Sequence, residues 1–116
     1  MDALQERDDQ QLLDAIAAGD MQAVTHFYQR HHLRVYRYVL SKLNDSFAAA
    51  DILNDVMLEV WKSASRFEGR AKVTTWLLGI AHHKVLDHWR KQGNREFVEL
   101  DDAMKDDSPN ADMEYV

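Results

Sequence analysis

The stretch FEGRAKVTTWLLGIAHHKVLDHWRKQ, residues 67–92, decides the fold, because it changes character partway along. It begins as a short polar segment with a glycine and an aromatic residue, and it continues with the periodicity of an amphipathic helix. Apolar residues recur on one side of that helix: Val73, Leu77, Ile80 and Ala81. Gly93 and Asn94 then indicate its end. We therefore expect a loop over residues 65–72 and a helix over residues 73–92.

Three further helices are predicted before this stretch. The first covers residues 9–18 and ends at Gly19, since glycine commonly follows a helix C-terminus. The second covers residues 21–43 behind Asp20, which is a favourable N-cap. The third covers residues 46–64, and Ser46 is able to cap it. The residues expected on its buried side are Ile52, Leu53, Val56, Val60 and Trp61. The fold class is therefore all-α, a compact bundle of about four helices.

Length and composition favour one small domain between two acidic ends. The chain has 116 residues and no cysteine, which is typical of a reducing cytoplasm. We expect residues 1–8 to be a disordered acidic N-terminus, residues 9–94 to form the helical domain, and residues 95–116 to be an acidic linker or tail that is largely irregular. The N-terminus does not resemble a signal peptide, and no apolar run approaches the roughly 18 residues of a membrane span. We therefore predict a cytoplasmic protein without membrane insertion.

The net charge of −6 hides a strong segregation of charge. Residues 21–92 hold eleven bases and six acids, whereas both ends are acidic. Residues 62–91 hold only two acids but seven of those bases. The bases are Lys62, Arg66, Arg70, Lys72, Lys84, Arg90 and Lys91. A total charge that argues against nucleic acid therefore does not exclude it, because the basic residues are concentrated in one connected strip.

The helix over residues 46–64 carries a polar outer face. Three of its five members are acids, and all recur at helical spacing. The members are Asp51, Asn54, Asp55, Leu58 and Glu59. One interpretation is a solvated acidic face with a stray leucine. The other is a docking face, in which carboxylates attract a basic partner helix and Leu58 supplies an apolar anchor.

The loop and the last helix combine basic and aromatic side chains. Arginine and lysine neutralise phosphates, and an aromatic ring such as Phe67 can stack on an unpaired base. Phe67 and Trp76 have an alternative role as core residues. Likewise, Asp87 has an alternative role in i,i+4 pairs with His83 and Lys91.

Enzymatic chemistry finds little support. The six histidines include no pair at i,i+4, and there is no cysteine partner for a metal site. No glycine-rich phosphate loop follows a strand, and no nucleophile stands in an identifiable motif. We therefore expect neither catalysis, nor a metal, nor a cofactor.

Three segments resemble bacterial sigma factors. DILNDVMLEVW, residues 51–61, resembles their D-L-V-Q-E-V-F-L-x-V-W segment. FEGRAKVTTWLLGIAHHKVLDHWRK, residues 67–91, is similar to the F-x-G-x-x-x-F-x-T-W-L-x-x-I-A-x-N-x-x-x-D-x-x-R-R segment of the extracytoplasmic-function (ECF) subgroup. QQLLDAIAAGDMQAVTHFYQRHHLRVYRYVLSKL, residues 10–43, is similar to their first conserved segment. The segments occur in the family's order and are identified as sigma factor region 2.

The resemblance implies two binding surfaces. In the family, the acidic helix binds the clamp helices of the largest subunit of core RNA polymerase, a role that maps onto Asp51, Asn54, Asp55, Leu58 and Glu59. The loop and last helix recognise and melt the promoter minus-ten element and hold its non-template strand. That role maps onto Lys62, Arg66, Phe67, Arg70, Lys72, Thr74, Trp76, His83, Lys84, Asp87, Arg90 and Lys91. The resemblance also implies an anti-sigma factor as partner.

The sequence departs from the family at some positions. His83 stands where asparagine is frequent, which affects the expected base preference. Nothing after Asn94 resembles the family's C-terminal helix-turn-helix domain, so we expect either a fragment or a single-domain member. Two alternatives stay open: a helical protein-interaction module without DNA recognition, and a small metal-binding or ligand-binding bundle that uses the histidines.

Overall fold

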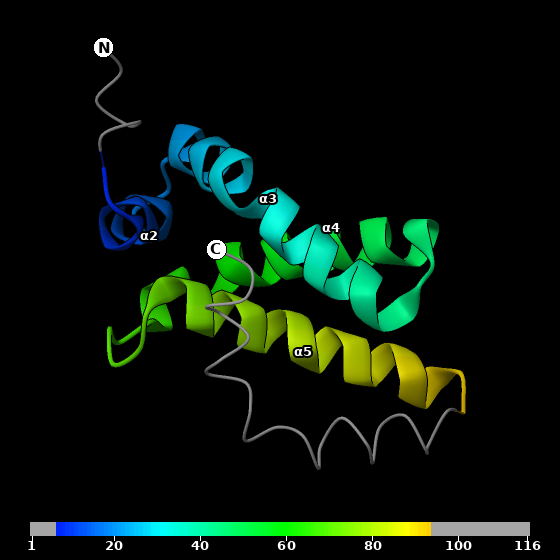
Figure 1. The fold of residues 1–116 in the computed structure, drawn as a ribbon. Coiled ribbons are helices and arrows are strands. Elements are labelled where there is room, and N and C mark those ends of the chain that lie inside the picture. The colour runs from blue at the N-terminus through cyan, green and yellow to red at the C-terminus, as the bar shows by residue number, and fades with distance from the viewer. Residues whose placement is uncertain (1–6, 94–116) are drawn as a thin grey trace.

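The computed structural model describes residues 7–93, and Figure 1 shows how the helices in this part of the chain are arranged. The elements are α2 (Asp9–Ala17), α3 (Met21–Leu43), α4 (Ser46–Ser63), the short 3-10 helix η1 (Ala64–Arg66) and α5 (Val73–Lys91). No strand occurs among the described residues. The prediction of an all-α bundle of about four helices is confirmed. The predicted acidic tail lies outside the described residues.

The first two helices begin at aspartates that satisfy free backbone N–H groups. Asp8 accepts a hydrogen bond from the Gln11 N–H at 2.7 Å, and the Gln11 side chain accepts one from the Asp8 N–H at 2.9 Å. This reciprocal capping box fixes the start of α2. Asp20 accepts from the Gln22 N–H at 3.0 Å, so its prediction as the N-cap of α3 is confirmed.

The start of α4 differs from the sequence-based prediction. Asp45, rather than Ser46, is the N-cap, and its carboxylate accepts from the Phe47 N–H at 3.0 Å and the Ala48 N–H at 3.1 Å. Asn44 ends α3 in a left-handed conformation, which places Asp45 in the extended conformation that an N-cap requires. Ser46 is therefore already the first helical residue. The predicted loop over residues 65–72 also begins with η1 instead of irregular chain.

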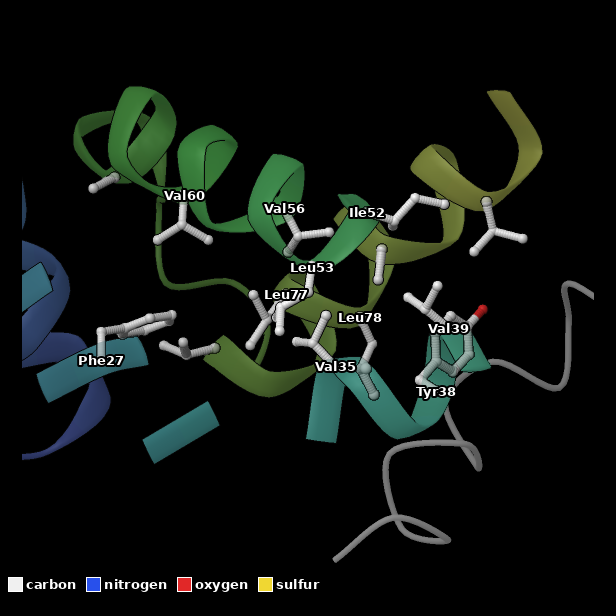
Figure 2. Close-up of a cluster of buried hydrophobic side chains, with 14 of the residues drawn as sticks. Phe27, Val35, Tyr38, Val39, Ile52, Leu53, Val56, Val60, Leu77 and Leu78 are labelled. Carbon is white, nitrogen blue, oxygen red and sulfur yellow. The ribbon is translucent and has the colours of Figure 1, made fainter. Parts of the chain in front are cut away.

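Three helices share one core. Side chains from α3, α4 and α5 meet along the length of the bundle, as Figure 2 shows for Val35, Val56 and Leu77. All three of these side chains are fully buried. Because each helix contributes an apolar stripe, packing of the stripes supplies most of the stability that isolated helices lack.

Two predicted core residues are less buried than expected. Trp61 was expected to be buried, yet 48% of its surface is exposed. The buried side of α4 includes Val56 and Val60, and the next residue along a helix points about 100° away. Ile80 packs against the core but is only partly buried, whereas Leu78, which the periodicity did not select, is buried on α5.

α2 covers one end of the three-helix core (Figure 1), in contact with α3 and η1. Its apolar face, formed by Leu12, Leu13 and Ile16, is buried. None of the helices within residues 7–93 combines the length and the apolar character that crossing a membrane requires.

Candidate functional site

A hollow of about 270 Å³ lies where the loop after η1 meets the first turn of α5. The residues that line it come from both segments: Arg66, Phe67, Glu68, Gly69, Arg70, Ala71, Thr75 and Trp76. The Phe67 and Trp76 rings form one side, with centroids 5.1 Å apart and planes tilted by 54°. Both rings also pack against the core, which is the alternative role that the sequence left open for them.

The loop that lines this hollow is shaped by a backbone hydrogen bond and a left-handed glycine. The Phe67 N–H donates to the Ala64 carbonyl at 3.3 Å, which turns the chain sharply after η1. Gly69 has a φ of 77°, a left-handed conformation that residues with a Cβ rarely adopt. Arg70 pairs with Glu68 at 2.9 Å on the rim, where both side chains are largely exposed. The lining includes Thr75, which sequence reasoning missed, in place of Thr74.

The outer face of α5 continues from the hollow towards the helix C-terminus. Trp76, His83, Asp87 and Arg90 lie close together around the helix axis because their positions differ by seven, four and three residues. Arg90 donates to the Asp87 carboxylate at 3.2 Å. This i,i+3 pair replaces the i,i+4 pairs with His83 and Lys91 that were considered from sequence. The His83 ring is exposed and contacts the His82 ring edge-on, with centroids 5.9 Å apart.

The outer face of α4 presents Asp51, Asn54, Asp55 and Leu58 to solvent, as the periodicity predicted. Within residues 7–93, neither Asp51 nor Asp55 takes part in a salt bridge. Leu58 is 49% exposed among these polar groups.

Glu59 differs from the other acids of α4. Its carboxylate accepts a hydrogen bond from the Ser63 hydroxyl at 2.5 Å and lies 3.9 Å from the Lys84 ammonium on α5. The hydrogen bond from Ser63 lowers the pKa of Glu59, and Lys84, Lys62 and Arg66 contribute in the same direction. Two residues that were assigned to different surfaces are therefore paired with each other.

Sequence reasoning missed two aromatic residues on the outer face of α4. Phe47 is 84% exposed at the start of the helix, and Trp61 is exposed near its end. Together with Asn54 they recur every seven residues, a spacing that keeps side chains on one side of a helix. That interval was the available signal, but Trp61 was assigned to the core and Phe47 was assigned no role.

The histidines do not converge. His31 is buried and its Nε2 lies 2.8 Å from an Asp9 oxygen, while His32 stacks on the Tyr28 ring at 4.9 Å. The Tyr38 hydroxyl lies 3.3 Å from His82 Nδ1. In the part of the chain that the structure describes, no three histidine, aspartate or glutamate side chains are grouped as a metal site requires.

Comparison with known proteins identifies the family. Residues 27–95 match the model of sigma-70 region 2. The ECF RNA polymerase sigma factor SigK of Mycobacterium tuberculosis is 33% identical over 90 residues, which cover 75% of this chain and 48% of SigK. SigM of the same organism is 34% identical over 98 residues, covering 84% and 50%. SigX of Bacillus subtilis is 37% identical over 65 residues, covering 56% and 34%.

The helical bundle and this match together define the class: the chain belongs to the sigma-70 region 2 family. It spans about half the length of the curated relatives SigK and SigM. No solved structure gives a significant match.

Proposed function

We propose that this chain is the part of a sigma factor that binds core RNA polymerase and recognises and melts the promoter minus-ten element during transcription initiation. The observation that carries the proposal is the hollow beside Phe67 and Trp76, which lies at the start of the basic helix α5 in a member of this family. Such a hollow is lined by aromatic rings and rimmed by cations, the two features that an unpaired base and its phosphates require.

The DNA half of the proposal uses the hollow and the solvent face of α5. A base of the non-template strand leaves the stack and enters the hollow, where Phe67 and Trp76 contact it. The neighbouring side chains bind the backbone or bases: Lys62, Arg66, Arg70, Lys72, Thr74, His83, Lys84, Asp87, Arg90 and Lys91. Unstacking a base costs about a few kcal/mol. Stacking returns about 1–3 kcal/mol per base, and phosphate contacts offset the remainder, so strand opening needs no ATP.

The polymerase half uses the outer face of α4. Asp51 and Asp55 are exposed carboxylates that attract a basic partner, and Leu58 is an apolar anchor on the same face. Asn54 and Glu59 complete the face that we assign to the clamp helices of the largest polymerase subunit. In this role the chain is an initiation subunit in the cytoplasm rather than an enzyme, and an anti-sigma factor is the expected inhibitor of the same surfaces.

Strand binding tests the DNA half. A labelled single-stranded minus-ten oligonucleotide is titrated with the chain and core polymerase, and Arg90→Ala with Lys91→Ala should weaken binding at least tenfold. The matched control is Arg7→Ala with Arg37→Ala, which removes the same charge from the residue before the α2 N-cap and from α3. Affinity should fall as salt rises, since phosphate contacts release counterions. Binding that ignores both α5 cations and base identity would refute promoter reading.

Co-purification with core polymerase tests the docking half. Asp55→Arg reverses one exposed charge on α4 and should abolish the complex while leaving the helical circular dichroism signal unchanged. Asp14→Arg, at an exposed position of α2, is the control and should leave the complex intact. Equal binding by both variants would remove α4 as the polymerase surface.

The exposed aromatic residues of α4 favour a second candidate, a protein-interaction module without DNA recognition. Phe47 and Trp61 give α4 an apolar surface suited to a partner helix. This candidate predicts that an anti-sigma factor or polymerase binds the chain. It also predicts that Arg90→Ala with Lys91→Ala changes neither the affinity for that protein nor the affinity for the DNA strand.

A further inference from the structure

The Glu59 carboxylate lies between the two surfaces just assigned. It belongs to α4, but its Oε1 atom is 3.9 Å from the Lys84 Nζ atom of α5. The side chains are 37% and 31% exposed, so the pair is accessible at the boundary between the helices. Ser63 holds the other carboxylate oxygen through its hydroxyl at 2.5 Å, which orients Glu59 towards α5.

Several cations gather around this single acid. Lys84, Lys62 and Arg66 come from α5, α4 and the end of η1, and all three act on Glu59 electrostatically. The hydrogen bond from Ser63 is the largest influence that lowers the pKa of Glu59, so the carboxylate is ionised at neutral pH. Asp51 and Asp55, on the same helix, have no salt-bridge partner among the described residues. Among these three acids of α4, Glu59 is therefore the one that is paired with a base of the basic strip.

We infer that Glu59 occupies, in the free chain, the place that a DNA phosphate takes beside Lys84, and that docking of α4 on polymerase draws the carboxylate away. This inference rests on the proposed function of the two surfaces. The Glu59 carboxylate and a phosphate oxygen compete for the same Lys84 ammonium group. Glu59 therefore lowers the affinity for the DNA strand until polymerase binds α4. Partly exposed pairs at this distance are weak, which makes the exchange reversible.

The consequence is a thermodynamic coupling between the two partners. If polymerase docking releases Lys84, polymerase raises the affinity for the strand, and by linkage the strand raises the affinity for polymerase by the same factor. Glu59 is thus a regulatory residue of the DNA surface rather than only another acid of the docking face.

Glu59→Gln tests the exchange, because the amide keeps the shape and still accepts from Ser63 but loses the charge. The full 116-residue chain, without polymerase, is titrated with a labelled single-stranded minus-ten oligonucleotide at low salt. Glu59→Gln should tighten binding about two- to fivefold, as expected for release from an exposed pair. Asp55→Asn, which removes the same charge one turn earlier, should change affinity by less than half as much. In a Lys84→Gln background, Glu59→Gln should give no gain.

Polymerase supplies the second arm. With saturating core polymerase, wild type and Glu59→Gln should bind the strand equally, because Lys84 is already released. Equal gains from Glu59→Gln and Asp55→Asn would mean a general effect of net charge and would overturn the inference, as would a gain that persists without Lys84. If Arg90→Ala with Lys91→Ala also leaves strand binding unchanged, the proposed function itself fails. If that double variant weakens binding, only the role of Glu59 is lost.

Discussion

The Nε2 atom of His31 lies 2.8 Å from Oδ1 of Asp9, and this contact joins the first helix to the core helices. His31 is buried on α3 beside the Phe27 ring, whose centroid is 4.5 Å from its own. Arg30 donates to the same Asp9 oxygen at 3.1 Å. A single carboxylate therefore satisfies a buried ring nitrogen and an arginine from the neighbouring helix.

Asp9 should make stability depend on acid pH. Its pKa is lowered in the folded chain, chiefly by the hydrogen bond from His31. The stabilisation is therefore complete above the ordinary carboxyl pKa of about 3.9 and is lost as pH falls through the lower, folded value. Asp9→Asn should lower the free energy of unfolding at neutral pH by about 1–2 kcal/mol and flatten this acid dependence. Urea unfolding at several pH values measures both effects.

Asp14→Asn is the matched control for that prediction. Asp14 lies on the exposed side of α2, where its carboxylate contacts only Gln10 among the described hydrogen bonds, at 3.1 Å. Its substitution should leave the unfolding free energy within about 0.5 kcal/mol of wild type. Similar losses from both variants would show that the Asp9 contact does not anchor α2.

The two tryptophans of α5 should separate stability from strand binding. Trp89 is 8% exposed in the core, and Trp89→Ala should cost about 3–5 kcal/mol, enough to unfold much of so small a domain. Trp76 is only partly buried, so Trp76→Ala should leave the chain folded but remove about 1–3 kcal/mol of base stacking. Thermal melting and strand titration measure the two quantities.

Trp76→Phe is the conservative comparison. It keeps an aromatic ring against Phe67 and should retain most of the strand affinity that Trp76→Ala loses. If alanine and phenylalanine at this position weaken binding equally, a ring contact with the base is not the reason for the loss.

Binding of core polymerase to the outer face of α4 should depend on the exposed aromatic residues of that face. Phe47→Ala and Trp61→Ala should each weaken core polymerase binding by about tenfold, the effect of one good interface anchor, with little change in melting temperature. Leu33→Ala, which truncates an exposed apolar residue of α3, is the control and should preserve binding. Pull-down against purified core enzyme distinguishes these outcomes, and loss of binding by Leu33→Ala alone would move the docking face to α3.

Local sequence signals predicted most of the fold. Asp20 and Gly19 bracket the turn between α2 and α3 because each acts on the backbone within a few residues of itself. The same reasoning placed the N-cap of α4 at Ser46, one position too late. Asp45 and Ser46 can both accept hydrogen bonds from backbone N–H groups, and only the backbone geometry selects Asp45. Trp61 was misplaced for a different reason: an aromatic side chain at the edge of an apolar stripe suits either side.

The candidate site was less predictable because it depends on tertiary packing. Glu59 and Lys84 are 25 positions apart, and no local pattern brings them together. Thr75 rather than Thr74 lines the hollow. Which of the two faces the loop depends on how the loop joins the first turn of α5. The spacing of Asp51, Asn54, Asp55 and Leu58 was informative because it concerns one helix alone.

Gly69 in the loop and Gly79 in α5 should respond to alanine in opposite directions. Gly69 has a φ of 77°, so Gly69→Ala should cost about 1–2 kcal/mol for its left-handed conformation. Gly79 lies within α5 at an ordinary helical angle, and nothing stands within 4 Å of an added Cβ. Gly79→Ala should therefore stabilise the chain by about 0.5–1 kcal/mol through helix propensity. Because Gly69 lines the hollow and Gly79 does not, only Gly69→Ala should also weaken strand binding. Thermal melts and oligonucleotide titrations of both variants give four readings, and destabilisation by Gly79→Ala would contradict the open space at this position.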